Sequence, residues 1–172
     1  MKAVILGWKR EYLTKYLDDC EKICYNLAKK NYTIVTGGGD GFMMAANKGA
    51  FECNKTKSIG ISVESIVNIE RNKNHYYLND NFHVAKNFAE RKFELYKDAD
   101  LIVFFPGGMG TLDEFTEILN LMKTNEYKKV PIILHGKKYW TSLIKWFGEN
   151  GIKFPNHLIS KITDDIDDYK NL

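Results

Sequence analysis

Short apolar runs alternate with amphipathic segments from one end of the chain to the other. The runs are nearly continuous in apolar residues, which is typical of strands buried on both faces of a parallel sheet. The segments between them place apolar residues at helical spacing, as Leu13, Leu17 and Cys20 do. These patterns predict strands at residues 2–6, 32–36, 58–62, 82–84, 100–105 and 130–134. They predict helices at residues 11–30, 41–52, 87–97, 111–123 and 138–149, and a last short helix at 163–169 capped by Thr163 or Asp164.

Residues 63–81 show only weak periodicity and carry many asparagines. They predict a long irregular loop at the rim of the domain. A loop of this length inside a compact α/β domain more often serves a function than not. One interpretation is therefore a cover over a binding site.

The alternation of strands and helices predicts an α/β fold with a doubly wound parallel sheet and helices on both faces. The 172 residues include no repeat, no low-complexity tract and no interdomain linker, so residues 1–172 are expected to form a single domain. In such sheets ligands bind beyond the carboxyl ends of the strands, where the strand order reverses. The residues at the strand ends are therefore the first candidates for a site.

Composition and charge add few constraints. With 25 basic and 22 acidic residues the net charge is +3, which gives no argument for a nucleic acid or a membrane as partner. No apolar stretch is long enough to span a bilayer and the start of the chain lacks a signal-peptide pattern, so a cytoplasmic protein is expected. Of the three cysteines, Cys20 and Cys24 are interpreted as small buried hydrophobic residues rather than as a metal or redox pair. The four histidines are scattered, and no metal is expected.

Two predicted strands end in glycine-rich turns that open into helices, GGGDG at residues 37–41 and PGGMG at residues 106–110. Either turn alone is equally well explained as a tight reversal of the chain. Two such turns at equivalent strand ends favour a ligand site, because glycine lets a ligand approach the backbone and a helix N-terminus attracts phosphate. The sequence contains no P-loop motif, and the GxGxxG dinucleotide fingerprint is absent after the first strand.

Charged residues stand close to the second turn. Thr111 fits the N-cap of the following helix, or its hydroxyl joins a phosphate cradle. Asp113 and Glu114 are expected in the first turn of that helix, where the helix dipole alone favours acidic residues. Because successive helical residues point about 100° apart, only one of the two faces the cradle, where it would lie near the sugar of a bound phosphate ester. Arg91 suits a bidentate grip on an anion, whereas Lys92 next to it is equally compatible with a solvated surface.

These motifs together resemble the LOG family, whose older label is "lysine decarboxylase-like". The family signature is an Arg-Lys pair followed by PGGxGTxxE, which here is Arg91-Lys92 and then PGGMGTLDE at residues 106–114. The segment GGGDGFM at residues 37–43 is similar to the family's GGGxxGxM. The resemblance covers most of the chain. The sequence differs from the family in four places. Trp8 lies where the family carries a Cys-Gly-Ser-Ser-like stretch, and Phe88-Ala89 replaces a common Met-His. Asn120 lies where a Thr is frequent, and residues 63–81 show no evident match to the family's acidic substrate-binding residue.

The resemblance implies a Rossmann-like homodimer that hydrolyses the N-glycosidic bond of nucleoside 5′-monophosphates, cytokinin ribotides among them, to free base and ribose 5-phosphate. It implies no organic cofactor and no metal. Decarboxylation of lysine would need an electron sink such as pyridoxal phosphate, and no sequence feature marks a site for one. By the same resemblance Arg91 and Glu114 would form the catalytic pair. The residues expected to bind substrate are Lys92, Gly37, Gly38, Gly39, Gly107, Gly108, Met109, Gly110, Thr111, Leu112, Asp113 and Asn120.

Three functional hypotheses follow from the sequence. The first is the N-glycosidase, and the second is a binding or sensing module that holds a nucleotide-derived ligand without turnover. A dinucleotide oxidoreductase is the third and lacks its fingerprint. A dimer would pair through a helix face, either the one with Phe115, Leu119 and Met122 or the one with Phe88 and Phe93, although both faces are also compatible with a core.

Overall fold

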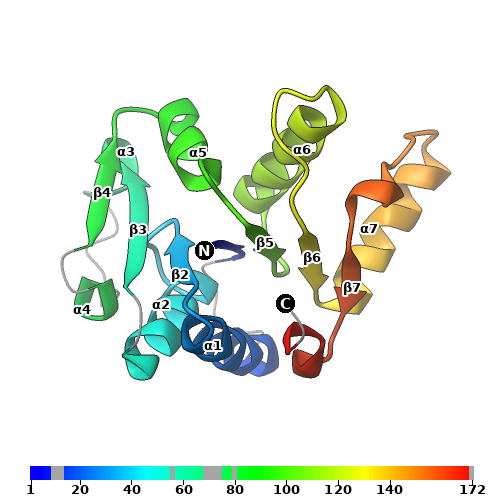
Figure 1. The fold of residues 1–172 in the computed structure, drawn as a ribbon. Helices are drawn as coiled ribbons and strands as arrows, with labels where there is room; N and C mark the ends of the chain where they lie inside the picture. Colours follow the sequence, from blue (N-terminus) through cyan, green and yellow to red (C-terminus); the bar gives the residue numbers. More distant parts are fainter. Residues whose placement is uncertain (9–13, 55–56, 68–74, 79–80, 171–172) are drawn as a thin grey trace.

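The computed structural model describes residues 1–172 except 9–13, 55–56, 68–74, 79–80 and 171–172. The described chain forms one seven-stranded sheet with the order β4-β3-β2-β1-β5-β6-β7, and all neighbouring strands are parallel (Figure 1). The strands are β1 (Lys2–Leu6), β2 (Thr33–Thr36), β3 (Ser58–Val63), β4 (Phe82–Ala85), β5 (Leu101–Phe104), β6 (Ile132–His135) and β7 (Lys161–Thr163).

The strand order reverses between β1 and β5. The chain runs outward from β1 through β2 and β3 to β4, then returns to pair β5 with the other side of β1 and runs outward again. Leu6 at the end of β1 lies opposite Phe104 at the end of β5, so these two strands finish side by side. The predicted doubly wound parallel sheet is confirmed, and its switch point is where ligands bind in such folds.

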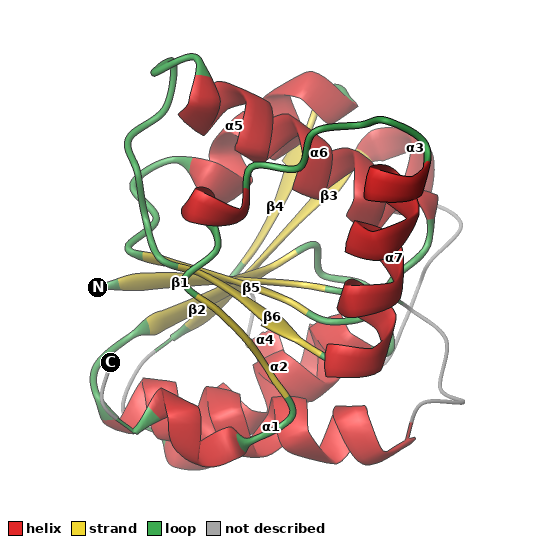
Figure 2. Ribbon diagram, turned by 90° about the vertical axis from the view of Figure 1, so that its right-hand side faces the viewer, coloured by secondary structure: helices red, strands yellow, loops and turns green. Residues whose placement is uncertain are grey.

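Helices cover both faces of the sheet (Figure 2). One face carries α1 (Thr14–Lys29) and α2 (Phe42–Cys53), and the other carries α5 (Phe88–Tyr96), α6 (Met109–Lys123) and α7 (Lys137–Glu149). Alternate residues of a strand point to opposite faces, so Ile5 joins the core beneath α1 and α2 while Leu6 joins the core beneath α5 to α7. Cys20 and Cys24 are free thiols buried in the first core, as expected.

Two segments differ from the sequence-based prediction. Residues 63–81 are not uniformly irregular, because β3 extends to Val63 and the short helices α3 (Glu64–Val67) and α4 (His75–Leu78) follow, while residues 68–74 and 79–80 lie outside the described part. The end of the chain holds a strand that was not predicted, β7, flanked by two 3-10 turns at Asn156–Leu158 and Ile166–Tyr169. Three-residue β7 is too short to show a period of its own.

The caps of two helices also differ from the prediction. Thr163 belongs to β7, and the cap of the last 3-10 turn is Asp165, whose carboxylate accepts a hydrogen bond from the Asp167 amide at 2.9 Å. Helix α6 begins at Met109 with Gly108 as its N-cap, so Thr111 is a residue of the first turn and not the cap. Asp113 and Glu114 therefore lie in the second turn of α6. The sequence-based prediction placed the start of this helix too late. Glycine has a low helix propensity, so the turn was expected to continue through Gly110.

The two aromatic faces considered for a dimer have different environments. Phe115, Leu119 and Met122 are core residues of α6, with at most 5% of each exposed. Phe88 and Phe93 on α5 remain 48% and 63% exposed. Within the described residues, no helix combines the length and apolar character needed to cross a membrane.

Candidate functional site

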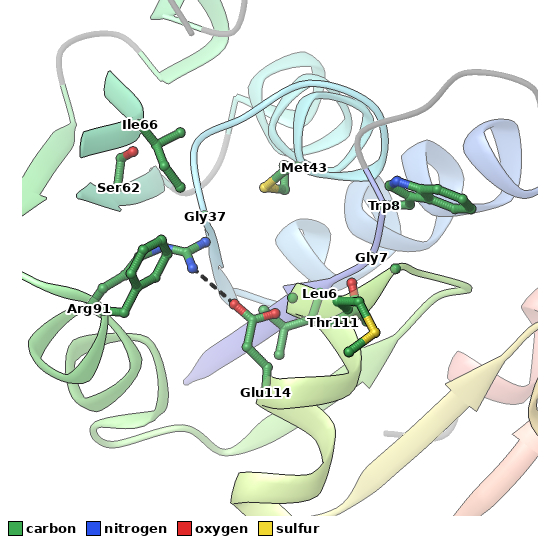
Figure 3. A pocket seen from close by; sticks show the side chains of 14 residues that line it. Leu6, Gly7, Trp8, Gly37, Met43, Ser62, Ile66, Arg91, Thr111 and Glu114 are labelled. Carbon is green, nitrogen blue, oxygen red and sulfur yellow. Dashed lines mark hydrogen bonds and ion pairs between the residues drawn. The ribbon is translucent and has the colours of Figure 1, made fainter. Parts of the chain in front are cut away.

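A cavity of about 350 Å³ opens at the carboxyl ends of β1, β2, β3 and β5, over the switch point of the sheet (Figure 3). Its residues come from strand ends and from the helices that follow them. They are Leu6, Gly7, Trp8, Gly37, Met43, Ser62, Ile66, Phe88, Arg91, Gly108, Met109, Gly110, Thr111 and Glu114. The two glycine turns and the Arg91 and Glu114 side chains thus meet at one place, as the sequence predicts.

The second glycine turn presents a helix N-terminus to the cavity. Gly108 has no side chain that caps α6, and the first hydrogen bond of the helix runs from the Leu112 amide to the Gly108 carbonyl at 3.0 Å. The amides before Leu112 in α6 have no acceptor within the helix, and the helix dipole adds a partial positive charge there. Gly108, Met109, Gly110 and Thr111 all line the cavity. This end of the site is built to receive an anion.

The turn is fixed by contacts behind it. The Tyr139 hydroxyl donates to the Gly107 carbonyl at 2.7 Å. A Cβ atom at Gly107 would lie 2.2 Å from Oγ1 of Thr111, so only glycine fits this position. Gly107 therefore shapes the turn but does not line the cavity.

The first glycine turn contributes differently. Its helix, α2, already has a partner for its first amide, because the Phe42 amide donates to the Trp8 carbonyl at 3.1 Å. Only Gly37 of the three predicted glycines lines the cavity, while Gly38 (φ +74°) and Gly39 do not. A Cβ atom at Gly37 would lie 2.2 Å from Nη2 of Arg91. This turn accommodates the guanidinium, and the second turn supplies the amides.

Arg91 and Glu114 form a nearly buried ion pair in the wall of the cavity. Nη1 of Arg91 donates to Oε1 of Glu114 at 3.1 Å, and 13% and 8% of their side chains are exposed. Nε of Arg91 donates to the Ile61 carbonyl of β3 at 3.0 Å, which fixes the guanidinium between β3 and α6. The two residues come from different helices, α5 and α6, and Figure 3 shows their side chains pointing toward each other.

The pKa of Glu114 is raised to about 7, chiefly because the carboxyl group is buried. The charge of Arg91 opposes this shift, that of Asp113 adds to it, and Lys92 opposes it more weakly. A carboxyl group with this pKa exchanges protons near neutral pH. It can accept a proton from water or donate one to a leaving group, which is the property that acid–base catalysis requires.

The raised pKa predicts a specific dependence of stability on pH. Glu114 binds a proton more tightly in the folded protein than in the unfolded chain, so its contribution to folding is present below about pH 4.5 and is lost as pH rises through about 7. Relative to Glu114→Gln, wild-type protein should lose on the order of 3 kcal/mol of unfolding free energy between pH 4.5 and 8. Urea unfolding of both proteins across this range measures how the difference between their unfolding free energies changes with pH. The cost of the unpaired Arg91 in the variant is the same at every pH, so it does not contribute to this change. A pH-independent difference would contradict the assignment.

Besides Gly38, Gly39 and Gly107, four more of the predicted binding residues lie outside the cavity wall. Nζ of Lys92 pairs with Asp113 at 3.0 Å and with Glu117 at 3.1 Å. Asp113 is 60% exposed, so of the two adjacent carboxylates only Glu114 faces the cavity, as the helical spacing predicts. Asn120 is exposed on the outer side of α6, and Leu112 packs against the core of that face.

Several lining residues were not singled out by the sequence. Gly7 and Trp8 follow β1, Ser62 lies near the end of β3, and Ile66 lies in α3. Their position at strand ends beside the switch point was the available signal. Ile66 belongs to the segment that was predicted to be irregular, and no motif marked it. Within the described residues no group of three His, Cys, Asp or Glu side chains is placed to hold a metal ion.

The fold and the site together define a Rossmann-like α/β protein in which a helix N-terminus and a buried Arg–Glu pair line one cavity at the switch point of the sheet. The family described as "Possible lysine decarboxylase" matches residues 43–167. The chain belongs to this family, which is the LOG family indicated by its motifs.

Curated relatives are named cytokinin riboside 5′-monophosphate phosphoribohydrolase. The protein from Rhodococcoides fascians is 26% identical over 77% of this chain and 66% of its own length. One from Arabidopsis thaliana is 24% identical over 84% of this chain and also 66% of its own length. The chain thus spans just under two thirds of the length of these relatives.

Solved structures share the fold at low identity. A structural genomics target, TM1055, has a TM-score of 0.72 and 23% identity, and the match covers 99% of this chain and 96% of that one. A molybdenum cofactor carrier protein from Chlamydomonas reinhardtii has a TM-score of 0.66 and 21% identity over 96% of this chain and 90% of its own. These likenesses concern the fold.

Proposed function

We propose that the protein hydrolyses the N-glycosidic bond of nucleoside 5′-monophosphates, releasing the free base and ribose 5-phosphate. The observation that carries the proposal is the Arg91–Glu114 pair, which lies in the same cavity as the open N-terminus of α6. A site that only bound phosphate would gain nothing from a buried carboxylate. The names of the curated relatives support the same reaction.

In this proposal the 5′-phosphate binds at the N-terminus of α6. The amides near Gly110 and the Thr111 hydroxyl supply hydrogen bonds, and the helix dipole supplies positive charge. Glu114 follows Gly110 by about one helical turn, so a ribose attached to this phosphate lies beside its carboxylate. No cofactor or metal takes part.

The proposed reaction breaks the bond between C1′ and the base nitrogen. The bond electrons leave with the base, and C1′ passes through an oxocarbenium-like state that the Glu114 carboxylate stabilises. Water then adds its oxygen to C1′. The departing base nitrogen takes up a proton from solvent. Glu114 accepts the proton of the attacking water and returns it to solvent after the reaction. Arg91 holds the carboxylate in place through its 3.1 Å contact and adds positive charge toward the phosphate.

Incubation of the purified protein with a panel of nucleoside monophosphates, diphosphates and triphosphates tests the proposal. We expect free base from monophosphates such as AMP or isopentenyl-AMP and much less from the longer phosphates, because one helix terminus receives one phosphate group. Intact nucleotides across the whole panel would count against the reaction.

The second candidate function is binding of a nucleotide-derived ligand without turnover. A molybdenum cofactor carrier protein and a molybdenum cofactor binding protein among the structures of the same fold favour it. A nucleotide that raises the melting temperature and stays intact for hours is the result that this alternative predicts. The carrier interpretation does not use Glu114, so Glu114→Gln should then leave the ligand's effect unchanged.

Gly110→Ala is expected to stabilise the protein and weaken its binding of monophosphates. A Cβ atom at Gly110 meets nothing within 4 Å, so alanine fits the free protein and should add about 0.5 to 1 kcal/mol to the stability of α6. The new methyl group would stand inside the phosphate end of the cavity, and we expect KM to rise at least about tenfold, the equivalent of 1.4 kcal/mol.

Gly148→Ala is the matched control, because Gly148 in α7 also has nothing within 4 Å of its Cβ position and does not line the cavity. It should give the same gain in stability with an unchanged KM. Wild-type binding by Gly110→Ala would show that the phosphate does not lie at this helix terminus.

From the family resemblance we also propose a cytoplasmic homodimer that acts on a small molecule, without nucleic acid or membrane as partner. The exposed Phe93 on α5 is a candidate contact, because 63% of it is open to solvent in the single chain. Light scattering coupled to gel filtration measures the assembly directly.

A further inference from the structure

The end of the cavity opposite the N-terminus of α6 combines the apolar side chains of Ile66 and Phe88 with the polar Ser62 and Arg91. In Figure 3, Ser62 and Ile66 lie on one side of the cavity, Thr111 and Trp8 lie on the other side, and Glu114 lies between them. Ser62 and Ile66 follow the course of β3 into α3, whereas Thr111 belongs to the first turn of α6. A ligand anchored at α6 therefore extends past Glu114 toward the side of β3 and α3.

Phe88 is an aromatic residue of the cavity wall that the proposed reaction does not use. It is the first residue of α5 and lies one helical turn before Arg91 on the same face of that helix. The ring is 48% exposed, although it borders a cavity that already has charged groups in its wall. A large aromatic ring left open beside a polar site gains contact area when a ligand covers it.

The start of α5 holds Phe88 in a defined position. The Asn87 side chain accepts a hydrogen bond from the Glu90 amide at 2.9 Å, and the Glu90 carboxylate accepts one from the Lys86 amide at 2.9 Å. The first bond is a side-chain N-cap, and the second ties the residue before the cap to the first turn of the helix. Phe88 is thus presented by an ordered helix terminus rather than by a loop.

We infer that Phe88 is a specificity-determining residue that stacks on the planar base of the substrate, with Ile66 adding apolar contact at the same end. This inference rests on the proposed function, because it assigns a binding position to the base in addition to those proposed for the phosphate and the ribose. Along the cavity the order is the helix terminus, the carboxylate, and then the end that carries Ile66 and Phe88. This order matches phosphate, ribose and base in a nucleoside monophosphate.

The substrate class follows from this order. The leaving group is a flat aromatic base whose apolar face fits Phe88 and Ile66. The cavity of about 350 Å³ lies at the small end of the range for ligand sites, which suits a mononucleotide better than a dinucleotide. Stacking tolerates different bases, because every base has a π-face. Phe88 therefore selects for the presence of an aromatic base more than for its identity.

Phe88→Ala and Phe93→Ala provide the test. Phe93 lies on the same helix, is 63% exposed and does not line the cavity, so it controls for the loss of an exposed aromatic ring from α5. Calorimetry with AMP and with ribose 5-phosphate compares ligands that differ by the base, and a Glu114→Gln background prevents turnover. Melting temperature and oligomeric state are measured for both variants. If Phe88→Ala folds poorly, Phe88→Leu takes its place, because leucine keeps much of the apolar volume but lacks the ring.

We expect Phe88→Ala to weaken AMP binding about tenfold and ribose 5-phosphate binding less than twofold, since the loss of one base–aromatic stack has roughly that effect. Phe93→Ala should leave both affinities unchanged. Equal weakening of both ligands by Phe88→Ala, a Phe93→Ala protein that behaves like Phe88→Ala, or a change of oligomeric state confined to Phe88→Ala would overturn the inference.

The two proposals fail separately in this design. If AMP binding depends on Phe88 but wild-type protein releases no adenine, stacking stands and hydrolysis fails. If adenine is released and Phe88→Ala keeps its affinity for AMP, hydrolysis stands and stacking fails. A protein that binds neither ligand overturns both.

Discussion

Replacing Glu114 by glutamine is expected to reduce kcat for base release by at least about a thousandfold while changing nucleotide affinity only severalfold. Glutamine keeps the shape of the side chain but can neither accept the proton of the attacking water nor balance positive charge at C1′, and acid–base groups of this kind contribute up to about 10⁴ in rate. Steady-state kinetics with AMP gives kcat, and calorimetry gives the affinity.

The neighbouring carboxylate offers a matched control. Asp113 is 60% exposed and its side chain pairs with Lys92 outside the cavity wall. Asp113→Asn makes the same chemical change one residue away, and we expect kcat within about threefold of wild type, as for loss of an exposed ion pair. Full activity of Glu114→Gln, or equal losses in both variants, would refute the role given to Glu114.

Replacing Arg91 by alanine is expected to impair folding, binding and turnover together. The variant leaves the Glu114 carboxylate nearly buried without its cation, and breaking a buried pair in this way costs about 3 to 5 kcal/mol. The loss should be smaller at pH 6 than at pH 8, because burial raises the pKa of Glu114 to about 7 and removal of Arg91 would raise it further, so protonation relieves the unpaired charge at the lower pH.

Arg91→Lys separates charge from geometry. Lysine keeps a positive charge but cannot contact the Ile61 carbonyl and Glu114 together through one planar group. We expect most of the stability to return at pH 8, with KM for AMP still at least about tenfold above wild type. Thermal unfolding at two pH values, combined with KM measurements, distinguishes the two contributions. Wild-type KM in Arg91→Ala would contradict a binding role for the guanidinium.

The sequence predicted the sheet well because its central strands consist mostly of apolar residues. β1, β5 and β6 are buried on both faces and bounded by glycine, proline or charged residues, so their existence and parallel pairing follow from local pattern. The strand β7 and the short helices α3 and α4 were missed. They are too short to show a period, and their form depends on contacts with distant parts of the chain.

The sequence identified the main charged residues and the PGGMG turn of the site, but it did not predict how the cavity around them is built. The PGGMG turn and the Arg-Lys pair identified residues that the fold brings together across two helices. The sequence treated the two glycine turns as equivalent, whereas the structure shows that the Phe42 amide of α2 is occupied by the Trp8 carbonyl. That hydrogen bond joins residues 34 positions apart, and no local pattern predicts it. The proximity of Ile66 and Phe88 to the site likewise depends on tertiary packing.

One measurement tests the central claim most directly: chromatographic detection of products after AMP is incubated with wild-type protein and with Glu114→Gln. The site described here predicts that wild type releases adenine and ribose 5-phosphate in equal amounts, and that Glu114→Gln binds AMP yet releases neither. AMP that binds the wild-type cavity, raises the melting temperature and remains intact would contradict it.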